Sequence, residues 1–290
     1  MQKRVFGIFA HNEARNIISS IESIQCACNS NIYVLINGCS DSTQSLVEEY
    51  GEKHKNVKPI VIKVGDKSNA WNVFVHTLNI DAELYYFLDG DCTVVKGALD
   101  EIEIALEKNT PNAVAATPEG TTKNRRKTAK NMLESGGLAG NFYVLTKQFI
   151  DRIRIKSIKL PIGTIGEDGL VGALAYWDLK PFSEWNLKNI LVLENANFAY
   201  TPLSPFSLDD IKLYYRRKIR YSCRFFQNKI ITESFRDDGL KWLNGHFNDR
   251  YDRYPKHLKI TWRGIDTYFD WLALSEIKEH NKKRGFADSL

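Results

Sequence analysis

The apolar run at residues 84–88 constrains the fold of this 290-residue chain more than any other segment. Its five residues are apolar or aromatic, and Asp89-Gly90-Asp91 follows them directly. Such a run is typical of a strand in a sheet covered on both faces, because the side chains pointing to either face are apolar. Polar residues at the carboxyl end of such a strand lie where open α/β sheets bind ligands. The segment therefore predicts an α/β fold with a ligand site beside Asp89 and Asp91.

The segments on either side of this run alternate between strand and helix patterns. Short apolar runs predict strands at residues 5–9, 31–36, 57–64 and 114–116. Apolar residues between them recur at the spacing of one helix face. They include Ile17, Ile21, Ile24, Leu46, Val47, Tyr50, Ala70, Trp71, Phe74, Leu99, Ile102 and Leu106. This alternation predicts βαβ units, and hence a mostly parallel sheet flanked by helices.

The pattern changes after Pro118. Residues 119–130 are polar and basic, so we expect a long exposed loop there. A long helix is expected from Ser207 onward, with one apolar stripe at Leu208, Ile211, Tyr215, Ile219 and Phe226. Basic side chains crowd the rest of this helix, at Lys212, Arg216, Arg217, Lys218, Arg220, Arg224 and Lys229. We therefore expect a larger domain of residues 1–205 and a helical, basic and aromatic-rich C-terminal extension of residues 206–290.

The composition fits a folded protein without disulfides. Apolar residues make up 43% of the chain and charged residues 26%, which suits a packed core. The five cysteines are irregularly spaced, so we expect reduced thiols, most of them buried. The first residues do not resemble a signal peptide, and no apolar run has the ~18 residues that a transmembrane helix needs. We therefore expect a cytoplasmic protein whose only membrane contact would be peripheral, at the inner face.

Polar clusters also lie beside three other predicted strands. Residues 10–13 follow the first strand, residues 37–43 follow the second, and residues 67–72 open the helix before the strand that ends at Asp89. The carboxyl ends of parallel strands share one edge of the sheet, so these clusters can converge on one pocket. Two carboxylates one residue apart suit Mg²⁺ or Mn²⁺. Ordinary turns and helix caps are the alternative explanation for each cluster taken alone.

The order of these motifs resembles that of family 2 glycosyltransferases of the GT-A fold. The motifs are Ala-His-Asn-Glu at 10–13, Asn-Gly-Cys-Ser-Asp-Ser-Thr at 37–43, Lys-Ser-Asn-Ala-Trp-Asn at 67–72, Leu-Asp-Gly-Asp at 88–91 and Gly-Glu-Asp-Gly-Leu at 166–170. The resemblance implies a Rossmann-like GT-A domain, a nucleotide-diphosphate sugar as donor and Mn²⁺ or Mg²⁺ as cofactor. It also implies transfer, usually with inversion, to the hydroxyl of a glycan, a lipid-linked sugar or a small molecule.

The resemblance assigns roles around the donor position by position. The implied donor residues are Ala10, His11 and Glu13 at the nucleoside, Asn37 and Asp41 at the base and ribose, and Lys67 and Asn72 elsewhere in the pocket. Ile36 departs from the pattern, since many members have an acidic residue there that contacts uracil. The nucleotide of the donor therefore stays open.

The resemblance also assigns the metal site. Asp91 would be the main ligand of the cation, with Asp89 nearer the ribose or the sugar. Gly90 would let the backbone turn tightly between them and approach the ligand.

The acidic pair Glu167 and Asp168 matches the family's pair at the start of a helix. An acceptor hydroxyl must lose its proton as it attacks the anomeric carbon, and a carboxylate within hydrogen-bond reach can take it. We assign Asp168 as this base, with Glu167 as the alternative. Stabilisation of a helix N-terminus by acidic residues is the competing structural explanation.

Basic and small residues provide the candidates for the acceptor side. The basic stretches at residues 123–130 and 212–229 fit the phosphates of a lipid-linked acceptor, an anionic membrane surface or an ordinary solvated face. Aromatic residues interleave with the second stretch, which favours an interface. A glycine-rich segment at residues 135–141 could approach the sugar or simply form a flexible turn. The candidate residues are Gly137, Arg125, Arg126, Arg220 and Arg224.

Several late residues have two explanations each. We expect His246 and His257 to be ordinary histidines, with an additional metal ligand as the alternative. We expect Trp242, Trp262 and Trp271 to be core anchors, with a stacking platform for an acceptor sugar as the alternative.

Three other functions compete with glycosyl transfer. A sugar-phosphate nucleotidyltransferase needs a glycine-rich loop with a basic residue after the first strand, where this chain has residues 10–13. A degenerate, non-catalytic protein that binds sugar nucleotides would not need a base at Asp168. The net charge of only +5 and the lack of a recognised motif argue against a nucleic-acid partner. Glycosyl transfer accounts for all the polar clusters together.

Overall fold

The computed structural model describes residues 2–25, 30–183 and 185–287. These residues form two compact units, one of Met1–Lys159 with Glu167–Thr201, and one of Leu160–Gly166 with Pro202–Leu290. The predicted division into domains of residues 1–205 and 206–290 stays a prediction. Among the described cysteines, Cys39 is half-buried, Cys92 and Cys223 are buried, and all three are free thiols. Cys26 and Cys28 lie outside the described residues.

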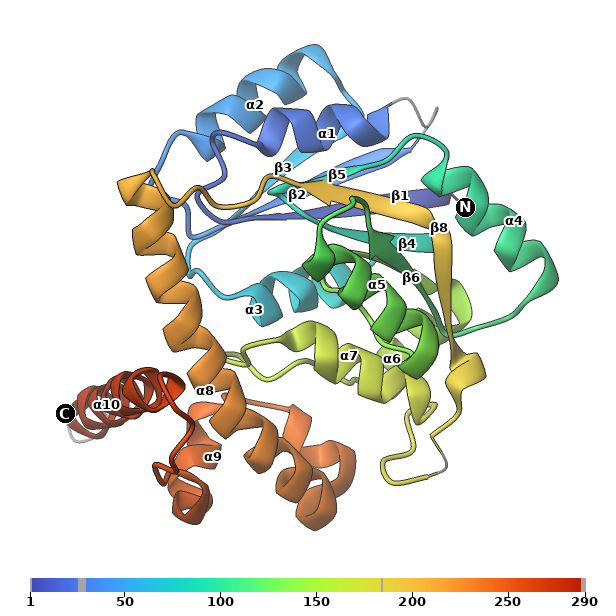
Figure 1. Cartoon of the computed structure of the whole chain (residues 1–290). Coiled ribbons are helices and arrows are strands. Elements are labelled where there is room, and N and C mark those ends of the chain that lie inside the picture. Colours follow the sequence, from blue (N-terminus) through green and yellow to red (C-terminus); the bar gives the residue numbers. More distant parts are fainter. Residues whose placement is uncertain (1, 26–29, 184, 288–290) are drawn as a thin grey trace. The chain divides into compact units, whose positions relative to one another are not determined.

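From β1 to β4 the first unit alternates strands and helices in the order that the sequence predicts, and β5 then follows β4 with no helix between them (Figure 1). Its strands are β1 (Gln2–Ala10), β2 (Asn31–Asn37), β3 (Val57–Ile62), β4 (Ala82–Asp89), β5 (Cys92–Val94), β6 (Ala113–Pro118), β7 (Phe142–Thr146) and β8 (Ile190–Tyr200). Its helices are α1 (Ile17–Gln25), α2 (Thr43–Lys53), α3 (Lys67–Asn72), α4 (Ala98–Lys108), α5 (Lys123–Ser135), α6 (Lys147–Ile155) and α7 (Glu167–Tyr176). A π-helical turn, Val73–Thr77, continues α3.

The eight strands form one mixed sheet in the order β3-β2-β1-β4-β7-β6-β8-β5. The pairs among β3, β2, β1 and β4 are all parallel, as predicted from the alternating strands and helices. β7 then pairs antiparallel with both β4 and β6, while β8 pairs parallel with β6 and antiparallel with β5. The parallel half brings the ends of β1, β2 and β4 to the same edge, where the predicted polar clusters lie.

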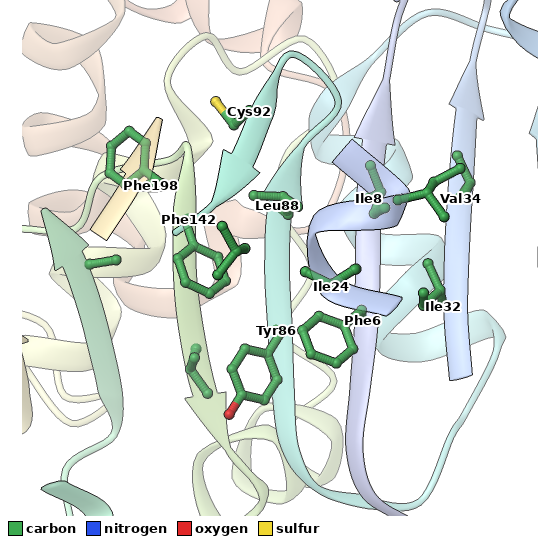
Figure 2. Close-up of a cluster of buried hydrophobic side chains, with 14 of the residues drawn as sticks. Phe6, Ile8, Ile24, Ile32, Val34, Tyr86, Leu88, Cys92, Phe142 and Phe198 are labelled. Carbon is green, nitrogen blue, oxygen red and sulfur yellow. The ribbon is translucent and has the colours of Figure 1, made fainter. Parts of the chain in front are cut away.

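One face of the sheet is covered by α1, α2 and α4. Their apolar side chains belong to one buried cluster with every second residue of the strands, such as Phe6, Ile8, Tyr86 and Leu88 (Figure 2). The rings of Phe6 and Tyr86 stack with centroids 4.5 Å apart. The β1 and β4 positions alternate between this face and the opposite one, as the period-2 geometry of strands requires.

The opposite face is covered by α3 and its π-helical turn, and its core is aromatic. Phe74 contacts Phe9 and Phe87 edge-on, and Phe87 stacks on Tyr143 with ring centroids 4.6 Å apart. Gly7 makes this possible, because a Cβ at that position would lie 2.9 Å from the Phe74 ring. In Figure 1, α1 and α2 lie on one side of the strands and α3 on the other. This sandwich holds the start of α3 at the sheet edge.

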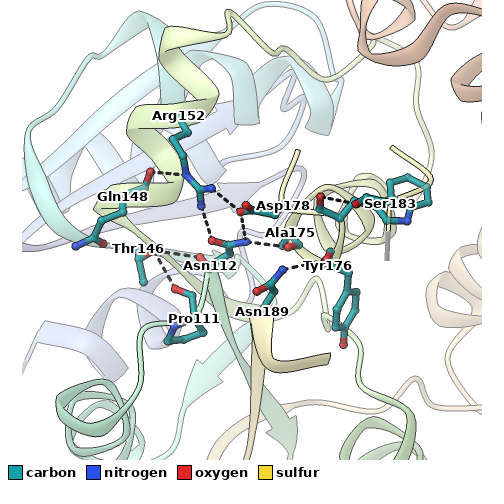
Figure 3. Close-up of polar contacts among 11 residues, drawn as sticks. Pro111, Asn112, Thr146, Gln148, Arg152, Ala175, Tyr176, Asp178, Ser183 and Asn189 are labelled. Atoms are coloured by element: carbon teal, nitrogen blue, oxygen red, sulfur yellow. Dashed lines mark hydrogen bonds and ion pairs between the residues drawn. The ribbon is translucent and has the colours of Figure 1, made fainter. Parts of the chain in front are cut away.

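A polar network joins α6, the end of α7 and the start of β6 (Figure 3). The Asn112 amide donates to the Ala175 carbonyl at 2.9 Å and to the Asp178 carboxylate at 3.0 Å. Arg152 donates to the Asn112 side-chain oxygen at 2.6 Å and forms an ion pair with Asp178 at 2.5 Å. Asn112 is 8% exposed, so its bonds are made in a largely dry site. The network holds α7 against the sheet.

The second unit is helical. It contains α8 (Leu208–Asp238), α9 (Asn248–Arg253) and α10 (Asp266–Ala287), with short 3-10 turns at Gly239–Leu243 and Pro255–His257. Gln227 of α8 is 1% exposed; its amide group accepts from Ile165 and donates to the Gly163 carbonyl and the Tyr251 hydroxyl. These bonds attach the segment Leu160–Gly166 to α8. Among the described residues, no helix is both long and apolar enough to cross a membrane.

The structure differs from the sequence prediction in four features. Residues 119–130 were expected to be a loop, which is wrong, because they contain the start of α5. Thr122 caps this helix, and Met132 is its buried residue. A helix that is polar on nearly all sides has no apolar stripe, so hydrophobic periodicity could not reveal it. β8 has no counterpart in the sequence prediction.

The tryptophans are the third difference. Trp242 is buried at 1% exposure, as expected of a core anchor. Trp262 and Trp271 are 86% and 55% exposed, so the prediction that they anchor the core is wrong. The apolar stripe of the long helix is likewise exposed at Leu208, which is 75% exposed.

We expect Asn112→Ala to lower the free energy of unfolding by about 1–3 kcal/mol, because Arg152 and the Ala175 carbonyl lose a buried partner. The control is Asn109→Ala, which removes one exposed bond to the Ala105 carbonyl and should cost less than about 0.5 kcal/mol. Urea denaturation followed by circular dichroism measures both. Equal losses for the two variants would show that the network does not stabilise the fold.

Candidate active site

The candidate site lies at the carboxyl edge of the parallel strands in the first unit. The Gly90 amide donates to the Phe9 carbonyl at 2.9 Å, which joins the turn after β4 to the end of β1. A Cβ at Gly90 would lie 3.1 Å from the Ala10 Cα. This contact would be tighter than most Cβ contacts, so glycine at position 90 favours the close approach of the two backbones. The structure brings Ala10 and Asp89-Gly90-Asp91 together in one place.

Asn37 organises the loops on the side of β2. It is 5% exposed, and its side-chain oxygen accepts from the Asp66 amide at 2.9 Å. Its backbone carbonyl lies 2.6 Å from His11 Nδ1. Since a carbonyl only accepts, His11 must carry a proton on Nδ1. The Asn12 amide then donates to His11 Nε2, at 3.5 Å. His11 and Asn37 therefore lie together, against the loop that leads into α3.

Asp41 connects the loops that follow β1 and β2. Its carboxylate accepts from the Ala14 amide at 3.1 Å and from the amide and hydroxyl of Thr43 at 3.0 and 2.6 Å. Burial acts to raise the pKa of Asp41, but these hydrogen bonds outweigh it and lower the pKa below its ordinary value. Asn12 was not among the predicted site residues. Its side-chain oxygen accepts from Ser40 and Asp41, and its left-handed φ of 58° was not visible in the sequence.

Glu13 and Asn72 also lie on this edge. The Glu13 amide donates to the Thr43 hydroxyl at 2.8 Å, and its carboxylate accepts from Asn16 at 3.1 Å. Asn72 is half-buried at the last position of α3, just before the π-helical turn. Both residues therefore come from segments that adjoin the polar edge.

Lys67 links two carboxylates from distant parts of the chain. Its ammonium lies 2.6 Å from the Asp89 carboxylate and 2.8 Å from that of Glu167. The Glu167 side chain is 6% exposed, and those of Lys67 and Asp89 are 26% and 24% exposed. Burial opposes the charged form of Lys67, but the two carboxylates hold its pKa well above the ordinary value. This pairing across three elements was not foreseen from the sequence.

Asp89 lies among charges of both signs. Burial, with the charge of Asp91, raises the pKa of Asp89 to about 7, while Lys67 acts in the opposite direction. A third carboxylate at Glu167 adds to the repulsion. The site thus collects more negative charge than its one lysine neutralises, which favours a bound cation.

Asp91 is half-buried beside the glycine-rich segment at residues 135–141. The Cys92 thiol donates to the Asp91 carboxylate at 3.3 Å, and Asn141 donates to the Cys92 sulfur at 3.4 Å. The Asn141 carbonyl accepts from the Asp89 amide at 2.9 Å. Burial raises the pKa of the Cys92 thiol, so it stays protonated and can donate. Cys92 and Asn141 therefore position the turn, although neither was predicted as a site residue.

Asp168 lies against the same segment. A Cβ at Gly140 would be 2.9 Å from the Asp168 Cβ and 3.1 Å from its carboxylate. Glycine at position 140 thus leaves the space that Asp168 occupies. Glu167 and Asp168 both lie in the first turn of α7, where the helix dipole favours negative charge.

The acceptor-side candidates have separate contacts within each of the two units. The Gly137 amide donates to the Tyr176 hydroxyl at 2.6 Å. Arg125 donates to the Glu119 and Tyr200 carbonyls and stacks over the Tyr200 ring, so its guanidinium supports the fold. Arg126 is exposed on α5. Arg220 and Arg224 belong to the second unit, where Arg224 packs against Gly166.

Asp89 and Asp91 are the side chains that could hold a divalent cation. Within the described part of the chain, no group of three or more His, Cys, Asp or Glu side chains forms a complete metal site. Two protein carboxylates suit a hard cation that keeps waters and takes its other ligands from phosphates. Of the late histidines, His246 is exposed, and His257 lies 3.1 Å from Glu233.

The family follows from comparison with known proteins. The model of glycosyl transferase family 2 matches residues 6–170, which is more than half of the chain. The chain therefore belongs to glycosyl transferase family 2. No curated protein sequence matches it.

Solved structures agree on the fold. The mannosyltransferase PcManGT from Pyrobaculum calidifontis, in complex with GDP-Man and Mn²⁺, matches with a TM-score of 0.59 and 14% identity, over 99% of this chain and 76% of that one. TarS 1–349 of S. aureus, in complex with UDP-GlcNAc, matches with a TM-score of 0.53 and 12% identity, over 98% and 92%. GalNAc-T7 with UDP, GalNAc and Mn²⁺ matches with a TM-score of 0.52 and 11% identity, over 86% and 55%. The predicted GT-A fold is confirmed.

We expect Lys67→Met to destabilise the protein by about 2–4 kcal/mol, because Asp89 and Glu167 lose the cation that they share in a partly buried site. Mn²⁺ should raise the melting temperature of this variant more than that of the wild type, since it restores a positive charge there. Thermal unfolding with and without Mn²⁺ measures both effects.

The matched control is Lys53→Met, whose ion pair with Glu49 is exposed at both ends. It should leave the melting temperature and its response to Mn²⁺ unchanged. The charge-sharing role of Lys67 is wrong if the two variants behave alike.

Proposed function

We propose that this protein transfers a sugar from a nucleotide diphosphate to an acceptor hydroxyl in a metal-dependent reaction, with inversion at the anomeric carbon. The observation that carries the proposal is the cluster at the sheet edge, where Lys67 joins Asp89 to Glu167 and the neighbouring residues are Asp91 and Asp168. Membership of glycosyl transferase family 2 supports the reaction class. The complexes of PcManGT with GDP-Man and of TarS with UDP-GlcNAc support the donor class.

The donor would bind along the edge formed by the ends of β1 and β2. His11 and Asn37 would contact the nucleoside, and Asp41 would hold their loops in place through Thr43 and Ala14. Ile36 is 1% exposed and belongs to the core, so that position offers no carboxylate to a base. Titration with different sugar nucleotides would identify the base.

The residues fit a divalent cation at the diphosphate. Asp91 would be its main ligand, because Asp89 already shares its charge with Lys67. A bound cation neutralises the charge that the leaving diphosphate gains. The carboxylate oxygens suit Mn²⁺ and Mg²⁺ alike, and both PcManGT and GalNAc-T7 carry Mn²⁺.

Asp168 is the proposed general base. Glu167 is 6% exposed on its side chain and forms an ion pair with Lys67, so its charge already serves the cluster. Asp168 is half-buried next to Gly140, in the first turn of α7. It would take the proton of the acceptor hydroxyl as the oxygen attacks the anomeric carbon. The acceptor, whether a glycan, a lipid-linked sugar or a small molecule, is not chosen by these residues.

We expect one class of sugar nucleotide to bind only with a divalent cation, and Asp91→Ala to lose this dependence. Calorimetric titration of UDP-, GDP-, CMP- and dTDP-sugars, with Mn²⁺ and with EDTA, tests this. EDTA should weaken the binding of the true donor by at least about tenfold, because the Asp91 carboxylate and the diphosphate are both negative and need a cation between them.

A suitable control is Asp100→Ala, which removes an exposed carboxylate on α4. It should bind the donor as the wild type does. Folded protein that binds none of the donors would contradict the proposed donor class.

We expect Asp168→Asn to lower the rate of donor hydrolysis by about 10²–10⁴-fold, because water then loses the base that takes its proton. Donor affinity should stay within about threefold of the wild type, since the substitution preserves shape. Glu167→Gln should instead weaken donor binding, because Lys67 loses a partner.

Turnover of the donor, followed by nucleotide release, separates these cases. A wild-type rate for Asp168→Asn would rule out Asp168 as the base. Donor binding without any turnover by the wild type would favour the non-catalytic alternative.

A further inference from the structure

The first half of α8 carries large apolar side chains that the protein does not cover. The structure describes the whole of α8, and its buried residues, from Ser222 to Phe235, begin only near the middle of the helix. In the first half, Leu208 is 75% exposed, Ile211 47%, and Tyr214 57%. An apolar stripe of this kind normally packs on a core. Here it faces outward over several turns.

A second exposed apolar segment runs into α10. Trp262 is 86% exposed and Ile265 78%, and Tyr268 and Trp271 are each more than half exposed. Soluble proteins seldom expose so many large side chains in one segment, and those that do usually bind a partner through them.

Contacts within the second unit place these two segments on adjoining helices. The hydroxyls of Tyr215 and Tyr268 are 2.9 Å apart, and the rings of Tyr215 and Phe269 are 5.4 Å apart. Lys218 forms an ion pair with Asp266 at 2.5 Å. We call the two exposed segments together the aromatic–basic surface; it comprises Leu208, Ile211, Lys212, Tyr214, Arg216, Trp262, Ile265, Tyr268 and Trp271.

The charge of this surface selects the partner. Lys212 and Arg216 are exposed among the aromatic residues. Asp209 and Asp210 lie in the first turn of α8, and Asp266 pairs with Lys218. From Ile211 to Thr232 the chain has basic residues and no acidic one, so positive charge predominates. A second copy of the chain would bring the same positive charges face to face, which is unfavourable. An anionic partner is complementary to it.

We propose that the aromatic–basic surface docks on an anionic phospholipid bilayer. Trp and Tyr side chains favour the boundary between lipid headgroups and acyl chains. Exposed Lys and Arg side chains beside them gain from the negative lipid surface. A helix with an apolar face and a basic face binds in the plane of this boundary without crossing it.

This docking is independent of the proposed sugar transfer, because it involves none of the residues placed in the donor site. Its consequence is that the second unit would hold the protein at a surface where lipid-borne substrates lie.

Vesicle sedimentation of the full chain tests the proposal. We expect binding to vesicles of phosphatidylcholine and phosphatidylglycerol mixed at about 7:3, and at least tenfold weaker binding to phosphatidylcholine alone. Emission from the tryptophans should shift to shorter wavelength on binding. High salt should weaken binding as it screens the charges. No donor or acceptor is needed, so failure here leaves the proposed reaction untouched.

Paired substitutions identify the surface. Trp262→Ser with Trp271→Ser, and separately Lys212→Glu with Arg216→Glu, should each lower the partition coefficient at least about tenfold. The matched control is Ile155→Ser with Lys156→Glu, which changes an exposed apolar residue at the end of α6 and the exposed basic residue that follows it. This control should bind as the wild type does. Circular dichroism and melting temperature confirm that each variant is folded.

Two results would overturn the proposal. One is a folded wild-type protein that does not bind anionic vesicles. Binding by both surface variants that is as strong as that of the control variant and the wild type would have the same meaning. The other is a homodimer by light scattering that Trp262→Ser with Trp271→Ser dissociates, because the surface would then be an interface between copies.

Discussion

The ion pairs of Lys67 with Asp89 and Glu167 are the interaction on which the site depends. Three elements meet there: the start of α3, the end of β4 and the start of α7. The buried carboxylate of Glu167, the half-buried one of Asp89 and a third at Asp91 repel one another, and the ammonium of Lys67 makes their proximity tolerable. The remaining negative charge suits a cation brought with a diphosphate. The same charges that strain the free protein therefore favour the proposed substrate complex.

Close backbone packing supplies the precision that this electrostatic cluster needs. Gly90 lets the turn after β4 touch β1, and Gly140 leaves space for Asp168. A Cβ at Gly38 would lie 2.5 Å from the Gly65 amide, so the loops after β2 and β3 also meet through glycine. Buried aromatic rings beneath, such as Phe74 and Phe87, fix the sheet and α3 on which these loops stand. The ends of rigid elements, together with the loops between them, thus hold the side chains of the site.

The second unit is held together by side chains of the long helix α8. Gln227 is buried and satisfies the backbone of the segment Leu160–Gly166, which precedes the acidic pair in the chain. The fully buried residues of α8 begin at Ser222, while Leu208, Ile211 and Tyr214 near its start remain exposed. The same helix therefore has buried side chains along its later turns and exposed apolar side chains along its first turns.

The sequence by itself determined the alternating strands and helices, the parallel half of the sheet and the clustering of polar residues at its edge, because strand and helix periods are local and the ends of parallel strands share an edge. Tertiary structure alone decided that α5 is a helix, since a polar helix has no periodic signal. It also decided that Trp262 is exposed while Trp242 is buried, because burial depends on which elements pack there. The pairing of Lys67 with Glu167 is of the same kind: contacts between residues distant in sequence arise only when the chain has folded.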